Sequence, residues 1–126
     1  MKTIIKTENA PAPIGPYNQA VLSDNTLYVS GQIAINPSNG KLEIDDLVNE
    51  THLVMKNMGA VLAAADMDYG KIVKCSIFIS NMGNFGTINE VYGSYFSKDF
   101  PARETVEVAC LPKNVNVEIS CVAVGG

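Results

Sequence analysis

The clearest candidate for an anion-binding residue is Arg103, which stands at the start of a predicted strand. Pro101 fixes its own φ and disfavours helix at Phe100, so an extended segment must begin there. Strand side chains alternate, which places Arg103 and Thr105 on one face. A guanidinium stays charged at any working pH, and its planar fork of donors matches a carboxylate or phosphate. The segment predicts a site for a small anion, although an exposed arginine paired with a neighbouring acid fits the same residues.

Two further side chains could take part in chemistry. Tyr17 ends a stretch of nine residues, 9–17, with three prolines and a glycine, which predicts a stiff loop presenting a hydroxyl that can donate or accept. Glu118 lies in a predicted C-terminal strand and points away from the face of Val117 and Ile119. The tyrosine fits either packing or ligand contact. The carboxylate is either paired with a cation as structure or is a positioned base.

Cysteine and histidine give little support for other chemistry. The three cysteines are odd in number and lack C-x-x-C spacing, which favours reduced, packed thiols at Cys75, Cys110 and Cys121. The single histidine, His52, falls inside a predicted helix, where a structural role is favoured over a base. With no Cys/His cluster, we expect no metal site.

Composition predicts one globular domain spanning residues 1–126. Charged residues make up only 17% of the chain, which suggests that some surface is buried against another chain. The net charge of −4 argues against binding to nucleic acid or an anionic membrane. The N-terminus lacks the apolar run of a signal peptide and no stretch is long enough to span a membrane, so we expect a cytoplasmic protein.

The elements that must position these residues follow from periodicity. Strands are predicted at 3–6, 26–34, 71–80, from Arg103 onward and at 115–124, with Gly31 marking a bulge or the close approach of a ligand or another backbone. Asp45 or Asp46 caps a first helix whose apolar stripe reaches Ala65, and a second helix starts near Phe85 and ends near Asp99. This order predicts an α+β sandwich in which both helices cover one face of a mixed sheet. The other face is left for subunits or ligand.

Six fragments of the sequence carry a family resemblance along nearly the whole chain. They are Ile14-Gly15-Pro16-Tyr17, Ser30-Gly31-Gln32, Phe100-Pro101-Ala102-Arg103, Val106-Glu107-Val108-Ala109, Leu111-Pro112-Lys113 and Val117-Glu118-Ile119. In this order and spacing they resemble the RidA (YjgF) family of reactive-intermediate deaminases. The resemblance implies a chorismate-mutase-like fold and a homotrimer whose sheets face a central barrel, with ligand clefts between adjacent subunits.

The same resemblance implies hydrolysis of 2-imino acids, such as 2-iminopropanoate and 2-iminobutanoate, to 2-oxo acids and ammonia, without metal or organic cofactor. By resemblance, Arg103 grips the substrate carboxylate and Glu118 positions the attacking water. The remaining residues implied to line the ligand are Tyr17, Ser30, Gly31, Asn89 and Thr105.

Two positions depart from the family pattern. Thr105 stands where many members have a cysteine, and Cys110 stands where an arginine is common. Thr105 excludes a thiol-dependent role at that position, and Cys110 removes a positive charge near the cleft.

The resemblance also brings three other functions into consideration, because relatives of the family are described in these ways. A non-catalytic 2-oxo acid sensor and a chaperone-like protein both fit, whereas a translation-inhibiting ribonuclease conflicts with the net charge and with the absence of a basic stripe.

Overall fold

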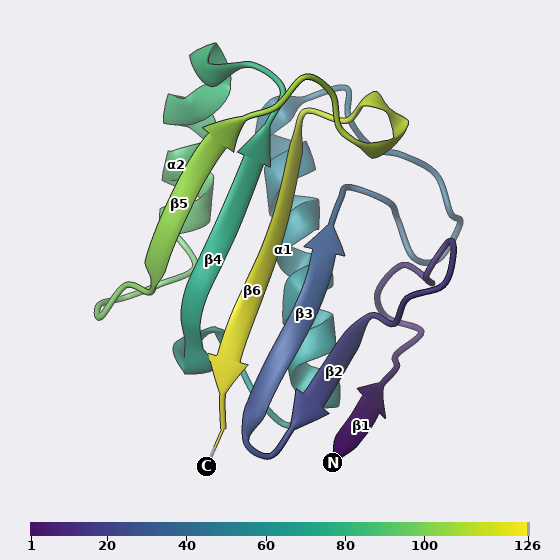
Figure 1. Ribbon diagram of the computed structural model, residues 1–126. Helices are drawn as coiled ribbons and strands as arrows, with labels where there is room; N and C mark the ends of the chain where they lie inside the picture. The colour runs from purple at the N-terminus through teal and green to yellow at the C-terminus, as the bar shows by residue number, and fades with distance from the viewer. Residues whose placement is uncertain (126) are drawn as a thin grey trace.

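One six-stranded sheet and two helices make up the fold. The computed structural model describes residues 1–125. The strands are β1 (Lys2–Ile5), β2 (Ala20–Ser23), β3 (Thr26–Gln32), β4 (Ile72–Ile79), β5 (Ala102–Glu107) and β6 (Val117–Val124). They lie in the order β1-β2-β3-β6-β4-β5, and every neighbouring pair is antiparallel except β4 and β5. Both helices, α1 (Leu47–Ala64) and α2 (Phe85–Gly93), lie behind the sheet in Figure 1, which confirms the predicted α+β arrangement.

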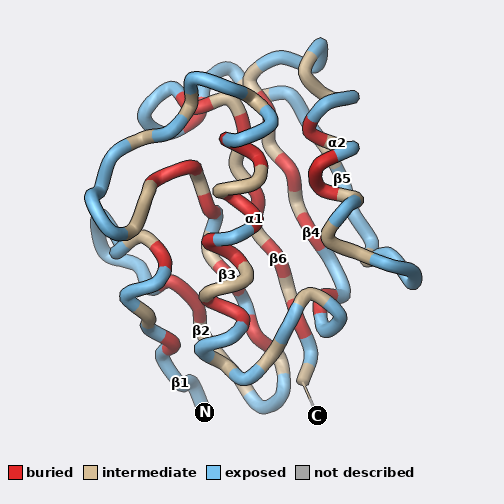
Figure 2. The backbone as a smooth tube through the Cα atoms, turned by 180° about the vertical axis from the view of Figure 1, so that it is seen from behind, coloured by how far each residue is buried: buried red, intermediate tan, exposed pale blue. Residues whose placement is uncertain are grey.

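The first helix matches its sequence pattern closely. Asp46 is the N-cap, and its carboxylate accepts a hydrogen bond from the backbone N–H of Asn49 at 3.1 Å. The apolar stripe is buried against the sheet, with Val54, Met55, Met58, Val61 and Leu62 inaccessible to solvent. Figure 2 shows this buried stripe along α1. Burial of that face supplies most of the helix's stability, because propensity alone rarely does.

The second helix is shorter than the sequence predicted, because it ends at Gly93 and not near Asp99. After Gly93 the backbone tightens into i to i−3 bonds, from Tyr95 N–H to Tyr92 and from Phe96 N–H to Gly93. The apolar residues beyond the helix pack as an aromatic cluster instead of extending the stripe. Within it the Tyr95 hydroxyl is hydrogen bonded to Nδ1 of His52 at 2.7 Å, which confirms a structural role for that histidine.

The boundaries of the five predicted strands differ from the predictions by one or two residues, whereas β2 was not predicted. The register of β3 shifts between Val29 and Gln32, so the predicted irregularity at Gly31 is present. Cys75 and Cys121 are buried free thiols, as expected. The prediction of a packed thiol at Cys110 was wrong, because Cys110 lies exposed in the loop after β5. No helix within residues 1–125 is long and apolar enough to cross a membrane.

The two faces of the sheet have different surroundings. On β6, Val117, Ile119 and Cys121 are buried on the side of the helices, and Glu118 and Ser120 alternate with them and point to the opposite face. Figure 1 shows that this chain leaves that face uncovered. Large apolar side chains stay accessible, and Tyr28 is 53% exposed. The strands thus place Glu118 at an open face, as alternation predicted.

Candidate functional site

Four of the predicted site residues meet at one cavity. Tyr17, Ser30, Gly31 and Glu118 help to line a hollow of about 450 Å³. We call this hollow the Glu118 pocket. Its other lining residues are Pro11, Ala12, Ile14, Gln19, Gln32, Ile33, Ile35, Pro112 and Lys113. Three segments far apart in sequence form its walls: the proline-rich loop, the end of β3 with the loop that follows, and the approach to β6.

Glu118 is the only acid among those lining residues, and its carboxylate is unpaired. Burial raises the pKa of this half-buried carboxyl above its usual range. Within residues 1–125 it has neither an ion pair nor a hydrogen bond; the ion pair found there joins Lys74 to Glu104 at 3.0 Å. The structural ion-pair interpretation therefore fails. An unpaired carboxylate with a raised pKa is suited to accepting a proton.

The glycine at position 31 makes room for that carboxylate. A Cβ atom at Gly31 would lie 2.5 Å from Oε2 of Glu118 and 2.8 Å from its Cδ. These separations are too short for any side chain at position 31 unless Glu118 moves. The sequence offered a bulge or the close approach of a ligand or another backbone. The register shift bears out the bulge, and the group packed against Gly31 is the Glu118 side chain.

Tyr17 and Ser30 occupy different situations in the pocket wall. Tyr17 is 49% exposed, and its hydroxyl accepts from the backbone N–H of Ile14 at 3.4 Å. The Ser30 hydroxyl donates to the carbonyl of Asn18 at 2.6 Å. Its proton is thus engaged within the protein, and only its lone pairs stay free for a ligand.

Sequence reasoning gave no role to Lys113, which lines the Glu118 pocket. It lies in the short 3-10 helix η3 (Pro112–Asn114) with a left-handed backbone, φ 57° and ψ 20°. The left-handed backbone of Lys113, which usually favours glycine or asparagine, is the feature that marks this residue as unusual. Backbone angles cannot be read from the sequence, so sequence analysis could not use it.

Two other predicted residues, Arg103 of β5 and Asn89 of α2, meet in a second group together with Phe85 and Tyr92 of α2, to which the sequence assigned only packing. We call this group the Arg103 cradle. The guanidinium carbon lies 5.5 Å from the Phe85 ring centre and 5.4 Å from that of Tyr92. Its Nη1 donates to Oδ1 of Asn89. The spacing of three and four residues places these α2 side chains on one helix face. They hold the guanidinium by stacking and by a neutral acceptor.

Within the described residues no carboxylate pairs with Arg103, so its charge is free to bind an anion. The guanidinium also borders a hollow of about 370 Å³ with Tyr92, Phe100 and Pro101. Thr105 stands nearby on the same strand with a buried hydroxyl that lacks a hydrogen-bond partner among residues 1–125. An acid-paired surface arginine is therefore not what the structure contains.

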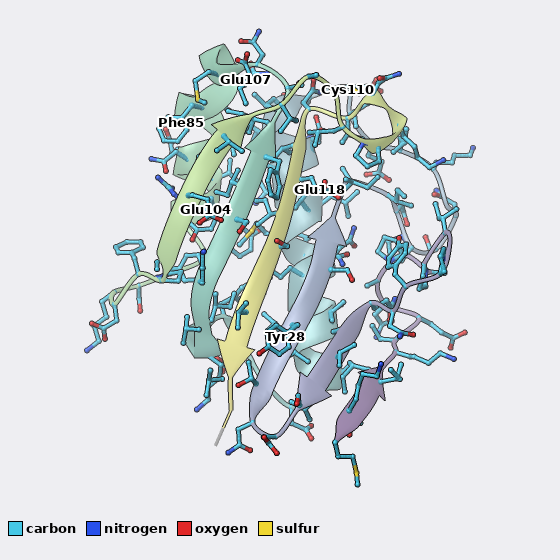
Figure 3. All side chains as sticks on the ribbon, viewed as in Figure 1. Tyr28, Phe85, Glu104, Glu107, Cys110 and Glu118 are labelled. Carbon is cyan, nitrogen blue, oxygen red and sulfur yellow. The ribbon has the colours of Figure 1, made fainter. Side chains whose placement is uncertain are left out.

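One chain does not bring the two groups together. Arg103 is in register with Cys75, and Cys75 with Cys121, three residues beyond Glu118. With β4 between β5 and β6, strand spacing and rise separate Arg103 from Glu118 by about 14 Å between Cα atoms. Glu118 lies on the uncovered face, whereas Phe85 lies behind the sheet at α2 (Figure 3), and it is the Phe85 ring that Arg103 contacts. A small ligand cannot touch both groups of the same chain.

The chemistry available is anion binding at one group and proton transfer or water positioning at the other. Nothing in residues 1–125 gathers three or more His, Cys, Asp or Glu side chains as metal ligands. The Glu107 carboxylate, which shares its face with Arg103, accepts from the backbone N–H of Met82 at 2.6 Å and is thus a structural group.

Comparison with known proteins identifies the family. The sequence model described as endoribonuclease L-PSP matches residues 7–125. The mouse protein named 2-iminobutanoate/2-iminopropanoate deaminase is 44% identical over 126 residues, which is all of this chain and 93% of that protein. A putative endoribonuclease from Thermotoga maritima superposes with a TM-score of 0.97 at 42% identity, covering 100% and 99% of the two chains.

The structure of E. coli TdcF with bound serine superposes with a TM-score of 0.94 at 38% identity, covering 98% of this chain and 99% of that one. Family model, relatives and structures agree along the full length, and they match the resemblance carried by the six sequence fragments. The chain therefore belongs to the endoribonuclease L-PSP family, which is the RidA/YjgF family of reactive-intermediate deaminases.

Proposed function

We propose that this protein is a 2-iminobutanoate/2-iminopropanoate deaminase, which hydrolyses reactive 2-imino acids to 2-oxo acids and ammonia. The full-length relative of that name supports the proposal. The single observation that carries it is chemical. The fold exposes one arginine without an acid partner and one unpaired carboxylate with a raised pKa, which are the two groups that hydrolysis of a carboxylate-bearing imine needs.

The active unit in this proposal is a homotrimer with a cleft between adjacent subunits. The separation of Arg103 and Glu118 within one chain supports a shared cleft, since each subunit would supply one group. The Arg103 cradle of one subunit would then face the Glu118 pocket of the next. The uncovered sheet face and its exposed Tyr28 support burial against other copies.

In the proposed reaction, Arg103 binds the substrate carboxylate through two parallel hydrogen bonds. Glu118 accepts a proton from a water whose oxygen bonds to the imine carbon. As that bond forms, the C=N π electrons of the protonated imine move to nitrogen, and Glu118 passes its proton to the resulting amine. The C–N bond then breaks, and the carbonyl forms as the hydroxyl proton passes through Glu118 to the departing ammonia. One water is consumed and one ammonium ion is released. Because a protonated imine is already electrophilic, orientation in a near-attack geometry supplies much of the acceleration, on the order of 7–11 kcal/mol in well-organised cases.

The remaining predicted residues have supporting roles in this proposal. Asn89 orients the guanidinium through its side-chain oxygen. The Thr105 hydroxyl, which is buried and has no partner within residues 1–125, would turn toward the substrate carboxylate beside Arg103. Tyr17 and Ser30 close the Glu118 side of the cleft, and Gly31 leaves space for the water-positioning carboxylate. No metal or organic cofactor takes part in any of these steps.

The test is the decay of 2-iminobutanoate generated in place by a threonine dehydratase. Arg103→Ala should raise KM and lower kcat, because it removes carboxylate binding. Glu118→Gln should lower kcat with KM retained. Lys56→Ala removes a positive charge from the exposed side of α1 and should react as wild type. Wild-type rates in both site variants, or no acceleration by the wild-type protein, would refute the proposal.

Ligand binding without turnover is the second candidate, and the serine bound to the TdcF homologue favours it. It predicts saturable binding of 2-oxobutanoate that is lost in Arg103→Ala, together with an imine decay rate equal to the uncatalysed one. The description of the family model as an endoribonuclease raises RNA cleavage as well. The net charge of −4 opposes it, and salt-dependent RNA binding would be its signature.

A further inference from the structure

The loop that carries Tyr17 has almost no means of holding itself in place. Segment 7–17 contains three prolines, which lack N–H donors, and it belongs to no strand or helix. Its internal hydrogen bonds are short-range. Asn9 N–H donates to the Thr7 hydroxyl, Tyr17 N–H to the Gly15 carbonyl, and Ile14 N–H to the Tyr17 hydroxyl. None of these bonds ties the loop to the sheet.

One buried side chain makes that connection. Gln19 is 4% exposed, and its Oε1 accepts from Thr7 N–H at 2.7 Å. Its Nε2 donates to the Thr7, Ala10 and Pro11 carbonyls at 2.9, 3.2 and 2.9 Å. In the described part of the chain, these are the hydrogen bonds that join segment 7–17 to residues outside it.

The backbone at Gln19 continues the connection to the opposite wall of the Glu118 pocket. The Gln19 carbonyl accepts from Ser30 N–H at 2.9 Å, and the Ser30 hydroxyl donates to Asn18 at 2.6 Å. Ser30 directly precedes Gly31, whose lack of a Cβ makes room for Glu118. A continuous chain of hydrogen bonds thus links the Tyr17 loop to the strand beside the carboxylate.

We propose that Gln19 is a positioning residue for Tyr17, which sets where the tyrosine stands at the substrate cleft. This inference rests on the proposed function. Gln19 has no amide proton left for a ligand, because both are shared among the three loop carbonyls, and its oxygen already accepts from Thr7. An apolar side chain of similar size would leave one N–H and three carbonyls of the loop unpaired. The loop would then gain more by opening to water than by staying packed.

The kinetic test is a double-mutant cycle between Gln19→Met and Tyr17→Ala. Gln19→Met should lower kcat/KM between about ten- and a hundredfold, because displacement of a cleft group by about 1 Å costs that much. In the Tyr17→Ala background the same change should cost less than about twofold, because Gln19 acts through the tyrosine. Equal losses in both backgrounds would overturn the proposal, since Gln19 would then act elsewhere.

Two variants guard the test against a trivial loss of fold. Tyr69→Phe removes a hydrogen bond of 2.7 Å to the Met55 carbonyl, far from the loop, and should leave kcat/KM unchanged in the folded protein. If Gln19→Met does not fold, Gln19→Glu takes its place in the cycle, because its carboxyl keeps an acceptor for Thr7 while losing the donors to three carbonyls.

A second measurement does not depend on enzymatic activity. Trypsin cleaves after Lys6 and chymotrypsin after Tyr17, and both bonds flank segment 7–17. Gln19→Met should speed cleavage at these two sites at least tenfold and leave cleavage after Lys71 unchanged, because only local opening is affected. Unchanged cleavage refutes the role of Gln19 whatever the activity. Faster cleavage in a protein without deaminase activity leaves the loop-holding role standing and refutes only the proposed reaction.

Discussion

Replacement of Gly31 by alanine tests whether the position of the Glu118 carboxylate matters to turnover. The added Cβ would lie 2.5 Å from Oε2, whereas ordinary van der Waals contact begins at 3.4 Å, so the oxygen must move by about 0.9 Å. Because the obstructing atoms are the far end of a flexible side chain, the rotation is cheap for folding. We expect stability to change by less than about 1 kcal/mol.

The cost should appear in catalysis. A displacement near 1 Å of a water-positioning group lowers the rate by about a hundredfold, so kcat of Gly31→Ala should fall by that factor. KM should change little, since in the proposed reaction the carboxylate of the substrate is bound by Arg103 and not by Glu118. The assay is imine decay in parallel with thermal unfolding. Gly93→Ala is the matched control, because a Cβ there meets nothing within 4 Å. Wild-type kcat in Gly31→Ala, or a loss of stability that accounts for the activity, would refute the reasoning.

Three further predictions follow from individual contacts. Asn89→Asp gives Arg103 an acid partner that competes with the substrate carboxylate. Because an exposed ion pair is worth roughly 1 kcal/mol, KM from steady-state kinetics should rise about fivefold, which is more than in the control Asn89→Ala. Burial raises the pKa of Glu118, so the folded state gains stability as pH falls through that raised pKa. Glu118→Gln should therefore have a higher Tm than wild type at neutral pH, and the difference in Tm should shrink in acid. Glu50 is fully buried, and its carboxylate accepts from the backbone N–H of Asn116 at 2.8 Å and from the side-chain amide of Asn116 at 2.7 Å. Glu50→Ala should therefore lower the free energy of unfolding, measured in urea, by roughly 1–3 kcal/mol.

Local rules in the sequence located both helices, five of the six strands and the direction of key side chains, but they missed β2 and the end of α2. The Asp46 cap and the three-and-four spacing behind it located α1, and alternation in β6 placed Glu118 on the uncovered face. These features depend on neighbours within a turn or on a period of two, so they can be derived without knowing the partners. The family resemblance then linked Arg103, Tyr17 and Glu118 to one reaction.

Tertiary structure decided the rest, because it depends on which distant atoms meet. Beyond the end of α2 at Gly93, Tyr95 packs on the distant Tyr69, a contact that local patterns do not reveal. Whether Glu118 has a cation within reach likewise depends on strand order. The Gln19 side chain is joined to the backbone N–H and carbonyl of Thr7. Because its partners are backbone atoms, no pattern of residue types reveals this connection. The separation of Arg103 from Glu118 also comes from register across β4. Sequence periodicity determines the face on which a residue lies, and packing determines what it meets there.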